Sequence, residues 1–106
     1  MEVIMIPTLD RLETLVLEWG ARKGILPDPN PDAQWGKTLE EVEELREAIN
    51  NGDREEAMDA IGDIFVTLVM QTQAWDCNMA ECVFMAYETI NKRNGKMVND
   101  VFVKDN

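Results

Sequence analysis

Apolar residues recur every three or four positions along most of this chain, and this spacing constrains the possible fold more than any other feature. It places apolar side chains on one face of an α-helix, whereas a half-buried strand would need strict alternation. Four stretches show this spacing, and residues that favour helix ends bound each of them. We therefore predict helices over about residues 8–23, 33–50, 54–74 and 79–92.

Capping patterns support two of these helix starts. Asp53 followed by Glu56, and Asn78 followed by Glu81, match the capping box, in which side chains satisfy free backbone N–H groups. Three prolines within residues 25–32 predict a loop between the first two helices.

A chain of 106 residues has room for a single domain over residues 1–106, with one core. Four amphipathic helices joined by mostly short turns predict an all-α four-helix bundle. The third helix is apolar on almost all sides from Ile61 to Met70, so we expect burial on more than one side. This favours a homodimer or homotetramer. The tail, residues 96–106, is expected to pack as an extended arm or to pair with a partner chain.

Net charge limits the possible partners. The chain carries a formal charge of −11, which argues against binding to nucleic acid or to an anionic membrane surface. No apolar stretch is long enough to cross a bilayer, and the first residues lack the pattern of a secretory signal, so we expect a cytoplasmic protein. An anionic substrate would need a divalent cation to mediate its binding.

Several catalytic chemistries are excluded by composition. The chain has no histidine, which rules out Ser-His-Asp and Cys-His nucleophile systems. Its two cysteines, Cys77 and Cys82, are a poor zinc set without histidine, and we expect them to be free thiols. The glycine-rich motif of P-loop nucleotide hydrolases is also absent.

Acidic residues on the second predicted helix form a candidate site. Spacings of three and four residues place one set of polar side chains on a single face. This set comprises Gln34, Lys37, Glu41 and Glu44. Glu41 and Glu44 border the apolar stripe, whereas Glu40, Glu43 and Glu47 are expected to face solvent.

The third predicted helix carries two acids, Asp59 and Asp63, on a face that apolar residues continue. Carboxylates near an apolar interior repel one another, which raises their pKa values, and a divalent cation removes the repulsion. Carboxylate oxygens suit Mg²⁺, or Mn²⁺ as a substitute. Glu56 extends this face by one turn, but its place behind Asp53 favours a capping role.

These motifs resemble a known family. The stretch Lys37-Thr-Leu-Glu-Glu-Val-Glu-Glu-Leu-Arg-Glu-Ala-Ile49 is similar to the first motif of the MazG-like all-alpha nucleoside triphosphate pyrophosphohydrolases, with Glu41 and Glu44 as its acidic pair. Asp59 and Asp63 occupy the second motif. Residues 87–104 resemble the short phage and bacterial members, so the resemblance covers about residues 33–104. One departure is Ala60, where the family pattern has Glu, and Asp59 is the expected substitute.

The resemblance implies Mg²⁺-dependent cleavage between the α and β phosphates of a nucleoside triphosphate, giving a nucleoside monophosphate and pyrophosphate. It implies Glu41, Glu44, Asp59 and Asp63 as metal ligands, with Glu41 and Glu44 also catalytic. Lys37, Arg93 and Lys96 are candidates for binding the phosphates, and Gln34 for meeting the base. A bacterial protein and a phage-encoded protein in its host both fit.

Two other functions stay open from sequence. One is a catalytically inactive acidic helical module that binds a protein partner, which explains the charge but not two aspartates on an apolar helix. The other is an enzyme similar to phosphoribosyl-ATP pyrophosphohydrolase, which shares the metal chemistry.

Overall fold

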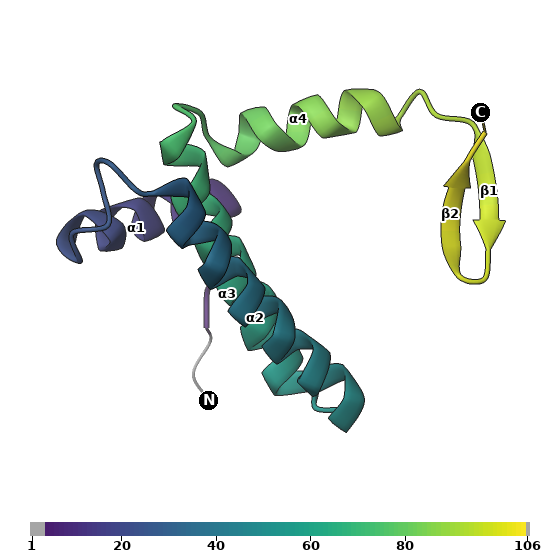
Figure 1. Cartoon of the computed structure of the whole chain (residues 1–106), viewed down its shortest axis with the longest axis horizontal. Coiled ribbons are helices and arrows are strands. Elements are labelled where there is room, and N and C mark those ends of the chain that lie inside the picture. Colours follow the sequence, from purple (N-terminus) through teal and green to yellow (C-terminus); the bar gives the residue numbers. More distant parts are fainter. Residues whose placement is uncertain (1–3, 106) are drawn as a thin grey trace.

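The computed structural model describes residues 4–105, which form four helices and a terminal hairpin (Figure 1). Residues 1–3 and 106, which the predicted domain and tail include, lie outside the described residues. The elements in chain order are α1 (Leu9–Arg22), α2 (Pro31–Asn51), α3 (Arg54–Ala74), α4 (Met79–Ile90), β1 (Gly95–Val98) and β2 (Val101–Lys104). The all-α class and the four helices are therefore confirmed. Within residues 4–105, no helix has both the length and the apolar character of a membrane span.

Helix starts follow local capping chemistry. The N–H of Glu56 donates to the Asp53 carboxylate (3.1 Å), and the N–H of Glu81 donates to the Asn78 side chain (2.9 Å), so both predicted N-caps are confirmed. The predicted capping role of the Glu56 side chain is wrong, because the N–H of Asp53 donates to the Ala48 carbonyl (2.9 Å). The predicted loop over residues 25–32 is wrong at its end, because α2 begins at Pro31. Asn30 caps this helix, and proline suits the first helical position, where its missing N–H would have had no partner within the helix.

The helices α2 and α3 form a long antiparallel pair, which runs obliquely to the long axis of the molecule (Figure 1). The helix α1 packs on α3, whereas α4 meets α3 only near the turn that joins them and then leads away. The predicted closed four-helix bundle is thus not formed by the described residues, since α4 does not return along α2 and α3.

A thin core lies between α1, α2 and α3. Its buried apolar side chains are Ala48, Ala60, Val69 and Met70. Gly20 of α1 lies against Met70, whose sulfur would be 2.7 Å from a Cβ atom at that glycine. Between α2 and α3, the Thr38 hydroxyl donates to Thr67 Oγ1 (2.8 Å), a buried hydrogen bond between side chains.

The chain has a larger solvent-accessible surface than a compact monomer of its mass. Its accessible surface is 8667 Å², whereas a compact monomer of 12.1 kDa exposes about 6,000 Å². Its radius of gyration is 16.4 Å, against about 13 Å for a compact domain of this length. On α3, Val69 and Met70 are buried but Ile61 is 58% exposed, so the protomer alone does not give the predicted burial on several sides.

The tail was predicted to pack as an extended arm or to pair with a partner chain. In the structure its two strands pair with each other as an antiparallel hairpin. Met97 pairs with Phe102 and Val98 with Val101. The connecting residues Asn99 and Asp100 have φ values of 50° and 65°, as a tight hairpin turn with two left-handed residues requires. All eight strand residues are exposed.

Candidate metal centre and adjoining cavity

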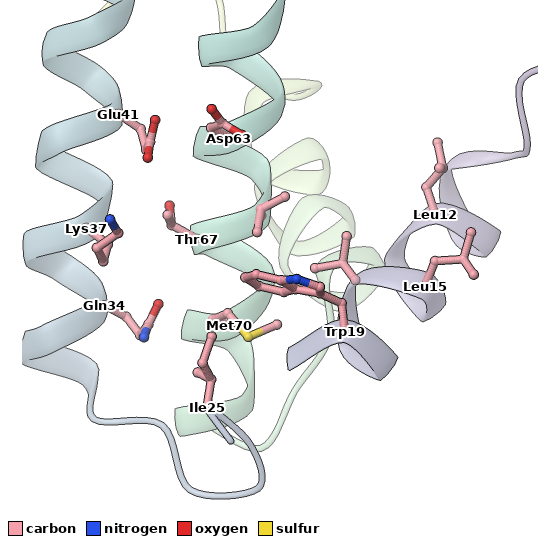
Figure 2. A pocket seen from close by; sticks show the side chains of 12 residues that line it. Leu12, Leu15, Trp19, Ile25, Gln34, Lys37, Glu41, Asp63, Thr67 and Met70 are labelled. Atoms are coloured by element: carbon pink, nitrogen blue, oxygen red, sulfur yellow. The ribbon is translucent and has the colours of Figure 1, made fainter. Parts of the chain in front are cut away.

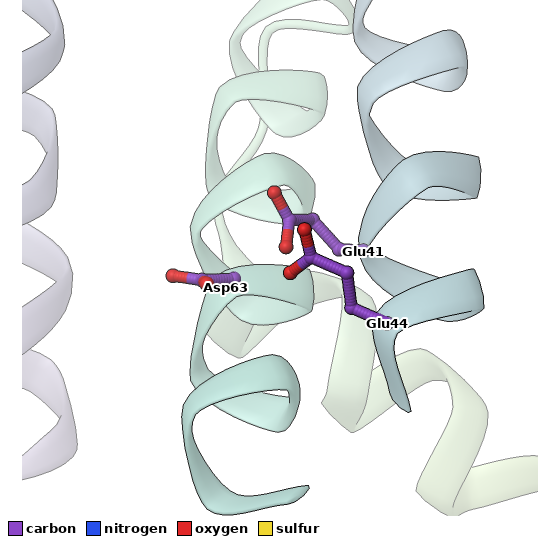
Figure 3. A group of neighbouring side chains, drawn as sticks. All are labelled: Glu41, Glu44 and Asp63. Atoms are coloured by element: carbon purple, nitrogen blue, oxygen red, sulfur yellow. The ribbon is translucent and has the colours of Figure 1, made fainter. Parts of the chain in front are cut away.

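Three carboxylates converge between α2 and α3 (Figure 3). Glu41 and Glu44 are three residues apart, so both project from one face of α2. The antiparallel packing of α3 places Asp63 opposite them, and one oxygen from each of the three groups lies within 4.8 Å of the others. The structure thus brings together three of the four predicted metal ligands.

Asp59 is not part of this group. It lies four residues before Asp63, which on a helix corresponds to a rotation of about 40° away from the same direction. Its side chain is exposed, although its charge is close enough to raise the pKa of Asp63. A direct contact between Asp59 and a metal stays a prediction.

The three carboxylates repel one another when all of them are ionised, and burial adds to the cost of their charges. Burial raises the pKa of Glu41, and the neighbouring Glu44 and Asp63 raise it further. Burial also raises the pKa of Asp63, with added effects from Asp59 and Glu44. Glu41 Oε2 is buried and has no hydrogen-bond partner among the described residues. An unpartnered buried oxygen beside two further carboxylates fits a hard divalent cation, which would supply the missing positive charge.

Lys37 does not neutralise the cluster. Its ammonium pairs with Glu40 at 2.9 Å, and this contact raises the pKa of Lys37. The pair is exposed, so it contributes little to stability. Lys37 nevertheless borders the cavity described next, one turn of α2 from Glu41.

A cavity of about 650 Å³ opens beside the carboxylates (Figure 2). This volume is typical of sites for small organic ligands. The polar side chains Gln34, Lys37, Glu41 and Asp63 line the part formed by α2 and α3. The helix α1 supplies an apolar wall that includes Leu12, Leu15, Val16 and Trp19. One end of the cavity therefore suits charged groups, and the other suits a flat apolar group.

Trp19 lies at helical spacing from the leucines of α1, which is also the pattern of a core residue. In the structure it is 36% exposed, and its indole ring lies along the cavity (Figure 2). Helical spacing does not distinguish a side chain that fills a core from one that lines a cavity, so the sequence held no signal for this role.

The two distal cations, Arg93 and Lys96, do not reach the carboxylates of their own protomer. Arg93 follows α4, and Lys96 lies on β1, which α4 carries away from the α2–α3 pair (Figure 1). Neither residue lines the cavity beside Glu41. Within one protomer, the predicted phosphate-binding set is thus reduced to Lys37.

The raised pKa values predict how stability depends on pH without metal. A carboxyl group with a higher pKa in the folded state binds protons more tightly when folded, so stability falls as pH rises from the unfolded pKa to the folded pKa. Replacing Asp63 with Asn removes this loss. The variant's gain in the free energy of unfolding over the wild type should therefore grow as the pH rises above about 4, the pKa of an unfolded Asp, and level off above the folded pKa. Urea denaturation in chelator measures this, and a gain that shrinks over the range would contradict the assignment.

Comparisons with known proteins agree with this geometry. Residues 31–98 match the family profile described as the MazG nucleotide pyrophosphohydrolase domain, from the first residue of α2 to the last residue of β1. No match was found among curated proteins or among solved structures. The matched domain supports a hydrolase that acts on nucleotides, and the acidic cluster agrees with the divalent-metal dependence general in this family. Because the match spans well over half of the chain, this protein belongs to the MazG nucleotide pyrophosphohydrolase family.

Proposed function

We propose that the protein is a Mg²⁺-dependent nucleoside triphosphate pyrophosphohydrolase that converts an NTP or dNTP and water into the monophosphate and pyrophosphate. The observation that carries this proposal is the convergence of Glu41, Glu44 and Asp63 beside a cavity of nucleotide size, whose polar end Glu41 and Asp63 line. Mn²⁺ is expected to substitute, because it accepts the same oxygen ligands.

Glu41, Glu44 and Asp63 would hold the cation. When bound, it would draw in the triphosphate and stabilise the negative charge that develops on phosphate oxygens. A carboxylate oxygen of Glu41 that is not needed for the cation accepts a proton from the attacking water. The water oxygen then bonds to phosphorus, the α–β anhydride bond breaks, and pyrophosphate leaves.

The nucleoside would occupy the rest of the cavity. Trp19 offers an aromatic face on which a base can stack, and the leucines of α1 exclude water beside it. The Gln34 amide provides both a donor and an acceptor for the polar edge of a base. Lys37 lies between Gln34 and Glu41 along α2, where it can contact a phosphate oxygen.

The remaining phosphate contacts would come from a second copy of the chain, as a homodimer or within a homotetramer. The chain exposes about 2,700 Å² more than a compact monomer of its size, so two copies together have about 5,400 Å² to bury, at the upper end of the range for a permanent subunit interface. The helix α4 and the hairpin carry Arg93 and Lys96 away from their own carboxylates, so these cations are free to serve the site of a neighbour.

Mixing two inactive variants tests this shared site. Protomers with Glu44→Gln lack a metal ligand, and protomers with Arg93→Ala lack the donated cation. A mixed dimer contains one intact site, so a co-expressed equal mixture should recover about a quarter of wild-type activity, since half of the dimers are mixed. An Arg93→Ala protein that is fully active alone would remove Arg93 from the site.

The reaction itself is tested by incubating the protein with a panel of nucleoside triphosphates and with phosphoribosyl-ATP, in Mg²⁺ or in chelator. Pyrophosphate and inorganic phosphate are assayed separately. Release of pyrophosphate that requires metal supports the proposal and ranks the bases. Cleavage of phosphoribosyl-ATP alone would identify the related enzyme. A folded protein that cleaves none of them would instead be an inactive module that binds a partner.

A further inference from the structure

Two thiols face each other at the joint between α3 and α4. The Sγ atoms of Cys77 and Cys82 are 3.6 Å apart, and both residues are free cysteines. Cys77 lies in the turn after α3, and Cys82 lies in the first turn and a half of α4. A disulfide needs an S–S separation of about 2.05 Å, which small side-chain rotations can reach from this starting distance.

Backbone hydrogen bonds hold both cysteines in place. The N–H of Cys77 donates to the Thr72 carbonyl (3.1 Å), and the Gln73 amide donates to the carbonyl of Cys77 (3.1 Å). The N–H of Cys82 donates to the Asn78 carbonyl (3.1 Å), as part of the first turn of α4. The approach of the two sulfurs is therefore built into the turn, which gives each thiol a high effective concentration at the other.

We propose that Cys77 and Cys82 are a redox-active dithiol that forms an intramolecular disulfide by exchange with a low-molecular-weight disulfide such as oxidised glutathione. The disulfide would link the turn that follows α3 covalently to the first turn of α4. Neither the metal centre nor the cavity includes these residues, so the inference does not depend on the proposed function.

The exchange proceeds in two balanced steps. Cys82 is the more exposed thiol, and its thiolate attacks one sulfur of oxidised glutathione, so that a protein–glutathione disulfide forms and one glutathione thiolate leaves. Cys77 then loses its proton to solvent and attacks Cys82 Sγ, which releases the second glutathione. The hydrogen bond with Cys82, burial, and the charges of Glu81 and Asp76 raise the pKa of Cys77 in the reduced dithiol. What makes Cys77 the attacking group of the second step is its position, because its Sγ atom lies 3.6 Å from Cys82 Sγ.

The position of the disulfide determines its mechanical effect. Apart from the turn itself, few contacts fix the start of α4, and the clearest is the N–H of Met79 donating to the Glu13 carboxylate of α1 (2.9 Å). A covalent bridge between Cys77 and Cys82 would restrict rotation of α4 relative to α3. Because α4 carries the hairpin, the oxidation state of the two thiols would limit the directions in which the tail can point.

The test uses the full chain, purified with reductant that is then removed without air. After incubation in oxidised glutathione, free thiols are alkylated and the intact mass is measured. We expect one product that has lost about 2 Da, carries no glutathione and reverts with dithiothreitol. Its rate of formation should not depend on protein concentration. In Cys77→Ser the second step is impossible, so this variant should accumulate with the mass of one glutathione on Cys82.

Three results would overturn the proposal: both thiols staying free in the wild type, a wild type that stops with glutathione attached, or disulfide-linked dimers whose formation depends on protein concentration. Amide hydrogen exchange over residues 75–82 tests the effect on the joint. It should slow in the oxidised wild type and stay unchanged in Cys77→Ser treated in the same way. Unchanged exchange in the oxidised wild type would refute the proposed restriction of α4 relative to α3.

Discussion

Replacing Glu44 with Gln should reduce pyrophosphate release by about 100-fold or more and should abolish the stabilisation of the protein by Mg²⁺. Mutating a residue that only hydrogen-bonds to a metal ligand typically lowers metal affinity or activity by about 10–100-fold. Removing a ligand itself should lower them at least as much. The glutamine keeps the size of the side chain and removes one charge from a crowded set. The metal-free variant should therefore be as stable as the wild type or more stable, since Glu44 raises the pKa values of both Glu41 and Asp63.

The matched control is Glu43→Gln. Glu43 is the adjacent residue on α2, is exposed, and belongs neither to the carboxylate group nor to the cavity lining. This variant loses the same charge, so it should keep wild-type activity and the wild-type increase in melting temperature with Mg²⁺. Equal losses in the two variants would mean that net charge, rather than a ligand, is responsible, and the metal site would then lie elsewhere.

Replacing Met70 with Ala should lower the free energy of unfolding by about 2–5 kcal/mol, a large fraction of the total for a domain of this size. Met70 is only 1% exposed, and its sulfur end packs against Gly20, where α1 crosses α3. Truncation removes the apolar side chain that joins these helices and enlarges the neighbouring cavity, which the surrounding residues cannot collapse to fill. Urea denaturation followed by circular dichroism, at fixed protein concentration, measures the loss.

The control for the loss of stability in Met70→Ala is Met5→Ala. It removes the same side chain from a site that is 87% exposed, so its effect should stay within about 0.5 kcal/mol. If Met5→Ala costs as much as Met70→Ala, burial within the protomer is not what makes Met70 important. Contacts of the N-terminal segment with another copy would then have to be considered.

Features set by neighbouring residues were the most predictable from sequence. The start of α3 follows from Asp53, whose side chain accepts a backbone hydrogen bond three residues away. The meeting of Glu41, Glu44 and Asp63 follows from two helical faces and one short turn, which together leave little freedom for the α2–α3 pair. Pro31 was misassigned because a proline both breaks a helix and favours its first position, and only the cap at Asn30 distinguishes these roles.

Features set by distant contacts were not predictable in the same way. The apolar face of α4, which includes Val83, Phe84 and Tyr87, has the same spacing as a core stripe, yet these residues are all more than half exposed. Spacing shows that a face must be covered, but it does not show whether the covering surface belongs to the same chain. The hairpin was missed because four-residue strands give weak patterns, although Asn99-Asp100 between two apolar pairs was a usable turn signal.

The hydrogen bond between Thr38 and Thr67 also determines the alignment of α2 and α3. Apolar side chains tolerate sliding of one helix along another, whereas this bond between two buried hydroxyls forms in a single register. Glu41 lies about one turn from Thr38, and Asp63 about one turn from Thr67, on the same side of that bond. A slip of one turn would move the opposing carboxylates apart by about 5.4 Å. Two threonines outside the carboxylate group therefore help to set the separation across which a cation must be held.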